Sequence, residues 1–282
     1  MGRHVSYQRK ITEKRGLGSG KDYIPWYKVG ESHDSSKRRE KSLGNGFKLK
    51  GLKTKRTHHL LSNYEKLLFI VFDLNPQISD IREQYPLLDT DLAHSISEEL
   101  GIKYPKFKNS QHILTSDFWI DFKSGSSRIV TFKPLGNIDS RQLELFQIEK
   151  IYWQRKGIEW HIMTELDIPH EPIWLSNYRD IYESINLFVS GDISIEPIQL
   201  LYNFLHTSFQ DFGQLGIVSF MKTADKKLNF EEGMSLRIFK ILIARRIINA
   251  DLRMNIFSNE VLLSSIKLSD NVRYIDKSNL VA

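Results

Sequence analysis

Residues 113–133 read ILTSDFWIDFKSGSSRIVTFK, two apolar runs joined by a short polar segment. Both runs are rich in β-branched and aromatic residues, and Lys123–Ser127 has the composition of a turn. The stretch therefore predicts a β-hairpin. If the turn is centred near Gly125, the numbers of residues that pair across the two strands sum to about 250. Asp117 is then expected opposite Lys133.

Alternation along the predicted strands places Asp117 and Asp121 on one face, together with Thr131 and Lys133. The other face is apolar and carries Leu114, Phe118, Ile120 and Phe122. A carboxylate and an ammonium that meet at one point are the core of a metal-dependent phosphodiesterase site. The carboxylate holds a divalent ion, and the lysine orients water or stabilises charge on the phosphate. The alternative is an Asp–Lys ion pair on a solvated face.

The composition limits the class of protein. At 282 residues the chain is long enough for one large domain or two ordinary ones. It has no apolar run near the roughly 18 residues that a membrane helix needs, and its polar, basic N-terminus does not resemble a secretory signal. The absence of cysteine excludes disulfides and thiolate metal sites and fits a reducing compartment. We therefore expect a soluble, cytoplasmic protein that makes no membrane contact.

The net charge of +6 is unevenly distributed. Residues 1–56 contain 16 Lys and Arg against 5 Asp and Glu, whereas the rest of the chain contains 24 (40 less 16) against 29 (34 less 5). We interpret residues 1–56 as a basic arm for an extended polyanion such as DNA, partly docked on the body through the aromatic segment Asp22–Val29. The candidate phosphate contacts in this arm are Arg9, Lys10, Lys14, Arg15, Lys37, Arg38 and Arg39.

Residues 57–168 predict a mixed α/β domain. Ser62 is a good N-cap for an amphipathic helix, and Gly101 and Gly157 each end a further helix. Because a helix precedes the last strand, we expect that strand to lie parallel to its neighbour. Helices are expected at 62–73, 91–100 and 140–156, and strands at 80–88 and 158–163 in addition to the hairpin.

The segment Asp167–Pro172 contains two prolines and few apolar residues, and we expect the domain boundary there. Residues 169–282 are expected to be mostly helical. Three helices and a hairpin match the outline of a winged-helix module. The last helix carries Arg245 and Arg246, which are further candidates for DNA contact. The helices are expected at 174–188, 195–210 and 231–248, and the hairpin at 251–258 with 260–267.

Glu65 is the second candidate carboxylate, one turn into the helix that begins after Ser62. One interpretation is a capping box, in which Glu65 bonds back to the amide at the helix start. The other is that the helix crosses the sheet and brings Glu65 to a metal beside Asp117.

Several motifs, in this order, resemble the TnsA family, the endonuclease subunits of heteromeric bacterial transposases. The resemblance covers most of residues 11–165 and is weak beyond residue 170. It rests on Gly16–Trp26, His58–Ser62 with Glu65, Asp80–Leu88, Thr115–Phe118, Phe132–Pro134 and Glu149–Gln154.

The resemblance implies a fold and an activity. It implies a restriction-endonuclease-like nuclease core with a mixed sheet and flanking helices, followed by a winged-helix-like C-terminal domain. It implies Mg²⁺- or Mn²⁺-dependent cleavage of the 5′ strands of double-stranded DNA at transposon ends, with one or two ions. The implied partners are a TnsB-like DDE transposase and, through the C-terminal domain, a TnsC-like AAA+ ATPase.

By the same resemblance, Glu65 and Asp117 match the metal-binding carboxylates and Lys133 matches the catalytic lysine. Thr131 departs from the family, whose nuclease motif usually has Gln or Glu two residues before the lysine. A hydroxyl is a poorer ligand for Mg²⁺, so the Phe132 backbone carbonyl and water are expected to complete the shell. Glu149 matches an acidic position and is either a further ligand or a solvated helix acid.

Two alternative functions remain open at this stage. A catalytically degenerate adaptor would link transposon-end DNA to the ATPase regulator, and Thr131 is the residue that favours it. A stand-alone restriction-type nuclease would cut naked DNA without partners. Binding of Mn²⁺ that depends on Glu65 and Asp117 separates the adaptor from either nuclease.

Overall fold

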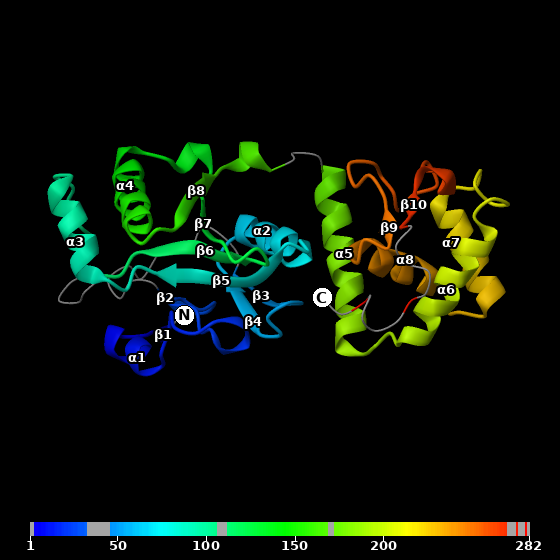
Figure 1. Ribbon diagram of the computed structural model, residues 1–282, viewed down its shortest axis with the longest axis horizontal. Helices are drawn as coiled ribbons and strands as arrows, with labels where there is room; N and C mark the ends of the chain where they lie inside the picture. The colour runs from blue at the N-terminus through cyan, green and yellow to red at the C-terminus, as the bar shows by residue number, and fades with distance from the viewer. Residues whose placement is uncertain are drawn as a thin grey trace. The chain divides into compact units, whose positions relative to one another are not determined.

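The computed structural model describes residues 3–32, 46–105, 112–168, 172–269, 275 and 280. The chain divides into two compact units, Met1–Ile168 and Pro169–Ala282 (Figure 1). The first is a mixed α/β unit, and the second is mostly helical. Among the described residues, no helix is long and apolar enough to cross a bilayer.

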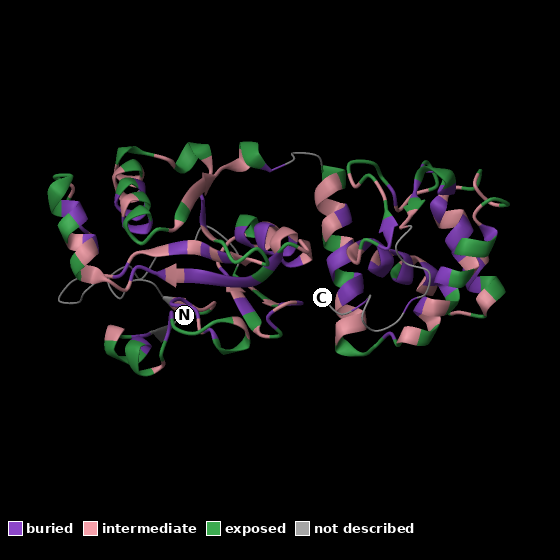
Figure 2. Ribbon diagram, viewed as in Figure 1, coloured by how far each residue is buried: buried purple, intermediate pink, exposed green. Residues whose placement is uncertain are grey.

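A four-stranded mixed sheet forms the centre of the first unit. It comprises β5 (Ile78–Pro86), β6 (Thr115–Phe122), β7 (Ser127–Phe132) and β8 (Glu159–Met163), in that order. The first three strands are antiparallel and β8 is parallel to β7, which confirms the hairpin and the orientation of the last strand. Buried residues run along most of β5, as Figure 2 shows.

The hairpin has a different register from the one expected. Phe118 pairs with Val130, so partner numbers sum to 248 and not to about 250. The turn closes through a bond from the Gly125 amide to the Phe122 carbonyl, and Gly125 itself has a φ of +88°. A left-handed glycine occupies the last position of a three-residue loop and not its middle, which moves the centre of the turn. Lys133 consequently lies beyond the last residue of β7 and is not directly opposite Asp117.

Three helices cover the two faces of this sheet. They are α2 (Asn63–Leu74), α3 (Thr90–Glu99) and α4 (Ser140–Arg155), and each begins after a side chain that accepts a bond from a first-turn amide. Phe72 of α2 meets Phe118 of β6 edge-on, at 5.6 Å between ring centroids. Trp119 points to the opposite face and meets Trp153 of α4.

The N-terminal residues fold onto this unit. The strands are β1 (Arg3–His4), parallel to β2 (Glu31–Ser32), and β3 (Phe47–Lys50), antiparallel to β4 (Thr57–Leu60); α1 spans Tyr7–Thr12. The aromatic segment that was expected to dock does so, since Tyr23 and Trp26 are each 2 % exposed. This segment covers the outer edge of β5, which would otherwise present unpaired backbone groups.

The second unit is built around α8. Its helices are α5 (Pro172–Ser190), α6 (Ile195–Ser208), α7 (Ile217–Leu228) and α8 (Met234–Ala244). Helix α8 packs against the other three, with Ile238, Phe239, Ile241 and Leu242 fully buried. Within the described part of the chain, short 3-10 helices lie at Gly20–Asp22, Leu135–Asn137, Glu165–Asp167 and Leu263–Ser265.

The hairpin expected at 251–258 and 260–267 is wrong. Instead β9 (Ile248–Asn249) pairs with β10 (Lys267–Leu268) across a long segment of turns. The apolar residues of that segment anchor it to the core without forming strands, as Ile256 does at 1 % exposed. Helix α7 was not expected, although its buried residues recur with helical spacing at 217, 220, 221 and 224.

Candidate active site

Asp117 lies in β6, and its carboxylate is fixed by the neighbouring strand. Its Oδ2 accepts a bond from the backbone N–H of Phe132 at 2.8 Å. Burial raises the pKa of Asp117 to about 6, against the lowering effects of that N–H and of the Lys133 charge. Lys133 is half-buried directly after β7, and its amide donates to the Met163 carbonyl of β8 at 2.9 Å. The hairpin therefore brings the acid and the amine close enough to interact, although they are not paired residues.

Glu65 lies at the capped start of α2, and its carboxyl is close enough to Asp117 to be affected by its charge. The Ser62 hydroxyl caps α2 by accepting a bond from the Glu65 amide at 3.1 Å. The Glu65 carboxylate, however, bonds the amide of Leu61 and not that of Ser62, at 2.9 Å. Its Oε2 also accepts a bond from Nε2 of Gln84 at 3.1 Å. Burial, and then the charge of Asp117, raise the pKa of Glu65 to about 8.

Glu149 is the third carboxyl of the site, and it lies on α4. The expectation of a solvated helix acid is wrong, since Glu149 is 6 % exposed. The Thr131 hydroxyl donates a hydrogen bond to Oε1 of Glu149. The residue that departs from the family pattern is therefore bonded to a carboxyl of the site. Burial raises the pKa of Glu149 to about 7, with a further contribution from Asp117.

Asp117 is the common neighbour of the two other acids. Glu65 comes from α2 and Glu149 from α4, and the charge of Asp117 opposes the ionisation of both. Carboxylate oxygens are the donors that Mg²⁺ prefers, and Mg²⁺ is usually held by one or two carboxylates with water and substrate phosphate. A divalent cation bound between Glu65 and Asp117 would relieve the repulsion between their two carboxylates. Among the described residues, no group of three or more His, Cys, Asp or Glu side chains is arranged to hold a metal, so the fit rests on this pair.

The basic arm differs from the expectation at two of its residues. Arg15 is 2 % exposed and pairs with Glu31 at 2.7 Å and with Glu13 at 2.8 Å. Lys10 is buried with its ammonium 3.7 Å from the ring centroid of Tyr27, and burial lowers its pKa to about 8. Neither side chain is placed to meet a phosphate, because local acids and aromatic rings already occupy them.

The other basic candidates are differently placed. Arg9 and Lys14 are exposed, and Arg9 pairs with Glu13. Helix α8 ends at Ala244, so Arg245 and Arg246 follow it; Arg245 is half-buried and Arg246 is exposed. Lys37, Arg38 and Arg39 lie outside the described residues.

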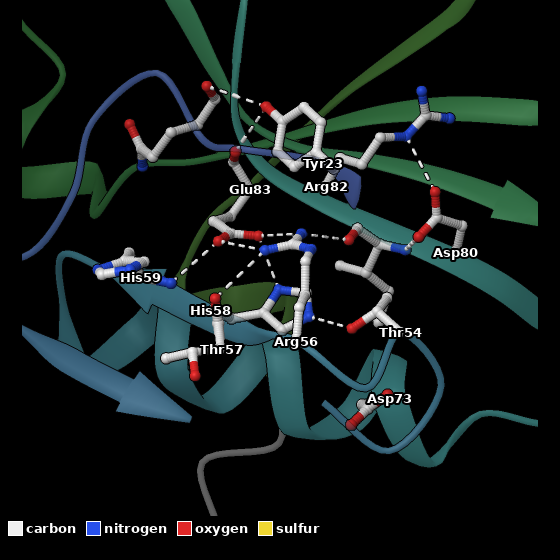
Figure 3. Close-up of polar contacts among 12 residues, drawn as sticks. Tyr23, Thr54, Arg56, Thr57, His58, His59, Asp73, Asp80, Arg82 and Glu83 are labelled. Atoms are coloured by element: carbon white, nitrogen blue, oxygen red, sulfur yellow. Dashed lines mark hydrogen bonds and ion pairs between the residues drawn. The ribbon is translucent and has the colours of Figure 1, made fainter. Parts of the chain in front are cut away.

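A buried ion network lies beside the site and anchors β4 to β5 (Figure 3). Both carboxylate oxygens of Glu83 are held by Arg56, at 2.6 and 2.8 Å. Nδ1 of His58 lies 2.7 Å from Oε2 of Glu83, and Nε2 of the same ring lies 2.7 Å from the Thr54 hydroxyl. His58 is fully buried, and both nitrogens of its ring face protein side chains.

Gln84 is a residue of the site that sequence reasoning missed. It follows Glu83 in β5, and its amide reaches Glu65. The register between β5 and β6 sets Gln84 opposite Asp117, and a correct strand pairing would have revealed this. The backbone conformation of Gln84, with a φ of +50°, has no signal in the sequence.

Comparison with known proteins gives two family matches and one relative. A family described as TnsA-like endonuclease N terminal matches residues 75–165, and one described as TnsA endonuclease C terminal matches residues 173–252. The chain is 31 % identical over 277 residues to the transposon Tn7 transposition protein TnsA of Escherichia coli. That alignment covers 96 % of each protein.

Proposed function

Because the chain belongs to the TnsA-like endonuclease family, we propose that it cleaves the 5′ strands of DNA at transposon ends in a divalent-metal-dependent reaction. The observation that supports this proposal is the position of Asp117, whose charge acts on the two buried carboxyls of Glu65 and Glu149 and which is itself influenced by Lys133. Buried acids with raised pKa values and a nearby cation are typical of functional sites. The core would be of the restriction-endonuclease type.

Glu65 and Asp117 are the residues that would hold one or two Mg²⁺ or Mn²⁺ ions, with the Phe132 carbonyl as a further ligand. A bound ion of this kind supplies Lewis acidity and lowers the pKa of coordinated water. Lys133 would orient the attacking water and neutralise charge on the phosphate. Glu149, held by the Thr131 hydroxyl, would keep a further carboxylate within the electrostatic reach of Asp117.

The partners follow from the family and not from contacts in the structure. We propose that the protein acts with a TnsB-like DDE transposase, and that Pro169–Ala282 contacts DNA or a TnsC-like AAA+ regulator as a winged-helix-like domain. Exposed basic residues, among them Arg9, Lys14 and Arg246, would contact the DNA backbone.

The test is nicking of a supercoiled plasmid by the purified full chain, with its transposase partners present and with Mn²⁺ or EDTA. Asp117→Ala is expected to abolish metal-dependent nicking and to unfold at the wild-type temperature or above, because it removes a carboxyl that repels Glu65. Asp91→Ala, an exposed acid on α3, is the matched control and should cut like the wild type.

Wild-type cleavage by Asp117→Ala would refute the assignment of the site. Calorimetric titration with Mn²⁺ separates the nuclease from the adaptor, since an adaptor would bind no ion through Glu65 and Asp117. Cleavage of naked DNA without partners would instead support a stand-alone nuclease.

A further inference from the structure

Gln84 has an unusual backbone for a residue inside a strand. Its φ is +50°, whereas Glu83 before it pairs with Phe118 and Tyr85 after it pairs with Ser116. The same register sets Gln84 opposite Asp117. A left-handed conformation costs a residue with a side chain about 1–2 kcal/mol, so the surroundings must impose it.

Two residues of the N-terminal segment, Tyr23 and Trp26, hold the backbone of this irregular position, which we call the Gln84 kink. The amide of Trp26 donates to the Gln84 carbonyl at 3.3 Å. The Tyr23 hydroxyl lies 3.4 Å from the same carbonyl and donates to the Glu83 carbonyl at 3.0 Å. Both residues are buried, so the segment that covers the edge of β5 also fixes its irregular residue.

The adjoining residue is fixed from the other side. Glu83 is fully buried, and its carboxylate is held by Arg56 and His58 and by the backbone amide of His59 at 2.9 Å (Figure 3). The kink therefore lies between two anchored groups and cannot relax by sliding along the strand.

The result of the kink is the direction of the Gln84 side chain. Its Nε2 donates to Oε2 of Glu65 at 3.1 Å, and its Oε1 accepts a bond from the Thr115 hydroxyl at 3.4 Å. Oε2 of Glu65 also accepts the Leu61 amide, so it is held by donors from two different parts of the chain. Two donors on one oxygen fix the orientation of the carboxylate.

We propose that Gln84 is a positioning residue whose strained backbone aims its amide at Glu65 and holds that carboxylate beside Asp117. The inference rests on the proposed metal-dependent nuclease function. It also gives the Tyr23–Trp26 segment a role in organising the site, since that segment fixes the conformation of Gln84.

The test uses Gln84→Gly and Gln84→Asn in the full-length protein. Glycine removes the amide and relieves the backbone strain. Asparagine keeps an amide and adopts a positive φ readily, but it is one methylene too short to reach Glu65. Both variants are expected to bind Mn²⁺ about tenfold more weakly in calorimetry. Both should unfold in urea at the wild-type midpoint or above it.

Asn229→Gly is the matched control, because Asn229 has a φ of 55° at the end of α7, in the second unit. It should bind Mn²⁺ like the wild type. Wild-type Mn²⁺ affinity in both Gln84 variants would overturn the inference, and so would a loss of affinity that comes with a lower unfolding midpoint in both. If Glu65→Gln and Asp117→Ala abolish Mn²⁺ binding in the same series, the proposed function stands whatever Gln84 does; if they leave it unchanged, the proposed function itself fails.

Discussion

Glu65→Gln is expected to stabilise the metal-free protein at alkaline pH while it abolishes metal-dependent cleavage. In the fold, burial and then the charge of Asp117 raise the pKa of Glu65 to about 8, from 4.5 in the unfolded chain. Between these values the folded chain keeps a proton that the unfolded chain has released. Ionisation of Glu65 therefore costs the folded state no stability below about pH 4.5. The free energy of unfolding falls as the pH rises from there to about 8.

The magnitude follows from the difference between the two pKa values. It corresponds to roughly 4–5 kcal/mol at most, at 1.36 kcal/mol for a pKa difference of one. The repulsion between Glu65 and Asp117 belongs to the pair and cannot be assigned to Glu65 alone. We therefore expect the free energy of unfolding to rise by about 2 kcal/mol when a neutral amide replaces Glu65. For a unit the size of Met1–Ile168, this raises the unfolding temperature by about 4–8 °C at pH 8.5. At pH 5, where Glu65 is protonated in the fold, the difference should nearly vanish.

Tryptophan fluorescence is the appropriate assay, because four of the five tryptophans lie in the first unit. Thermal unfolding is followed in EDTA at pH 5 and at pH 8.5. Glu144→Gln, a half-buried acid on α4 that pairs with Arg141, is the control and should show no such pH-dependent gain. A Glu65→Gln variant that is less stable than the wild type at pH 8.5, or equally shifted at both pH values, would refute the reasoning.

Two further predictions concern residues on either side of the site. Thr131→Val removes a donor to Glu149, whose pKa burial has already raised to about 7, and so raises that pKa further. Cleavage at pH 7 should fall by about three- to tenfold and recover at higher pH; an unchanged acidic limb of the pH–rate profile would contradict this. Glu83→Gln leaves Arg56 buried without its counter-charge and should lower the free energy of unfolding by about 3–5 kcal/mol in urea titrations. A loss below about 1 kcal/mol would show that the pair is dispensable.

The sequence predicts most of the elements around the site because their signals are local. Alternating and helical periodicities locate the hairpin, the helices at 62–73 and 140–156, and the final parallel strand. The roles of Glu65, Asp117 and Lys133 come from the family resemblance, since spacing alone leaves a solvated ion pair and a helix cap as alternatives.

The features that could not be predicted depend on partners distant in sequence or on backbone conformation. A count of positive charge does not reveal that Arg15 faces Glu31, so the sequence predicts a phosphate contact where the structure has a buried ion pair. The register shift depends on where Gly125 lies within its loop, and composition does not give that position. The conformation of Gln84 is imposed by Trp26 and Tyr23 from another part of the chain.

Two buried acids of the first unit, Glu83 on β5 and Glu65 on α2, show how structural and functional carboxylates differ. Burial opposes the ionisation of Glu83, but His58 and Arg56 hold its pKa well below the usual range, so the protein itself supplies the compensating positive charge. Burial also opposes the ionisation of Glu65, whose neighbouring charge is another acid, Asp117, and its pKa rises. The first arrangement is complete without a ligand. The second favours binding of a cation, because a positive charge placed between the two acids would remove the repulsion that the fold leaves in place.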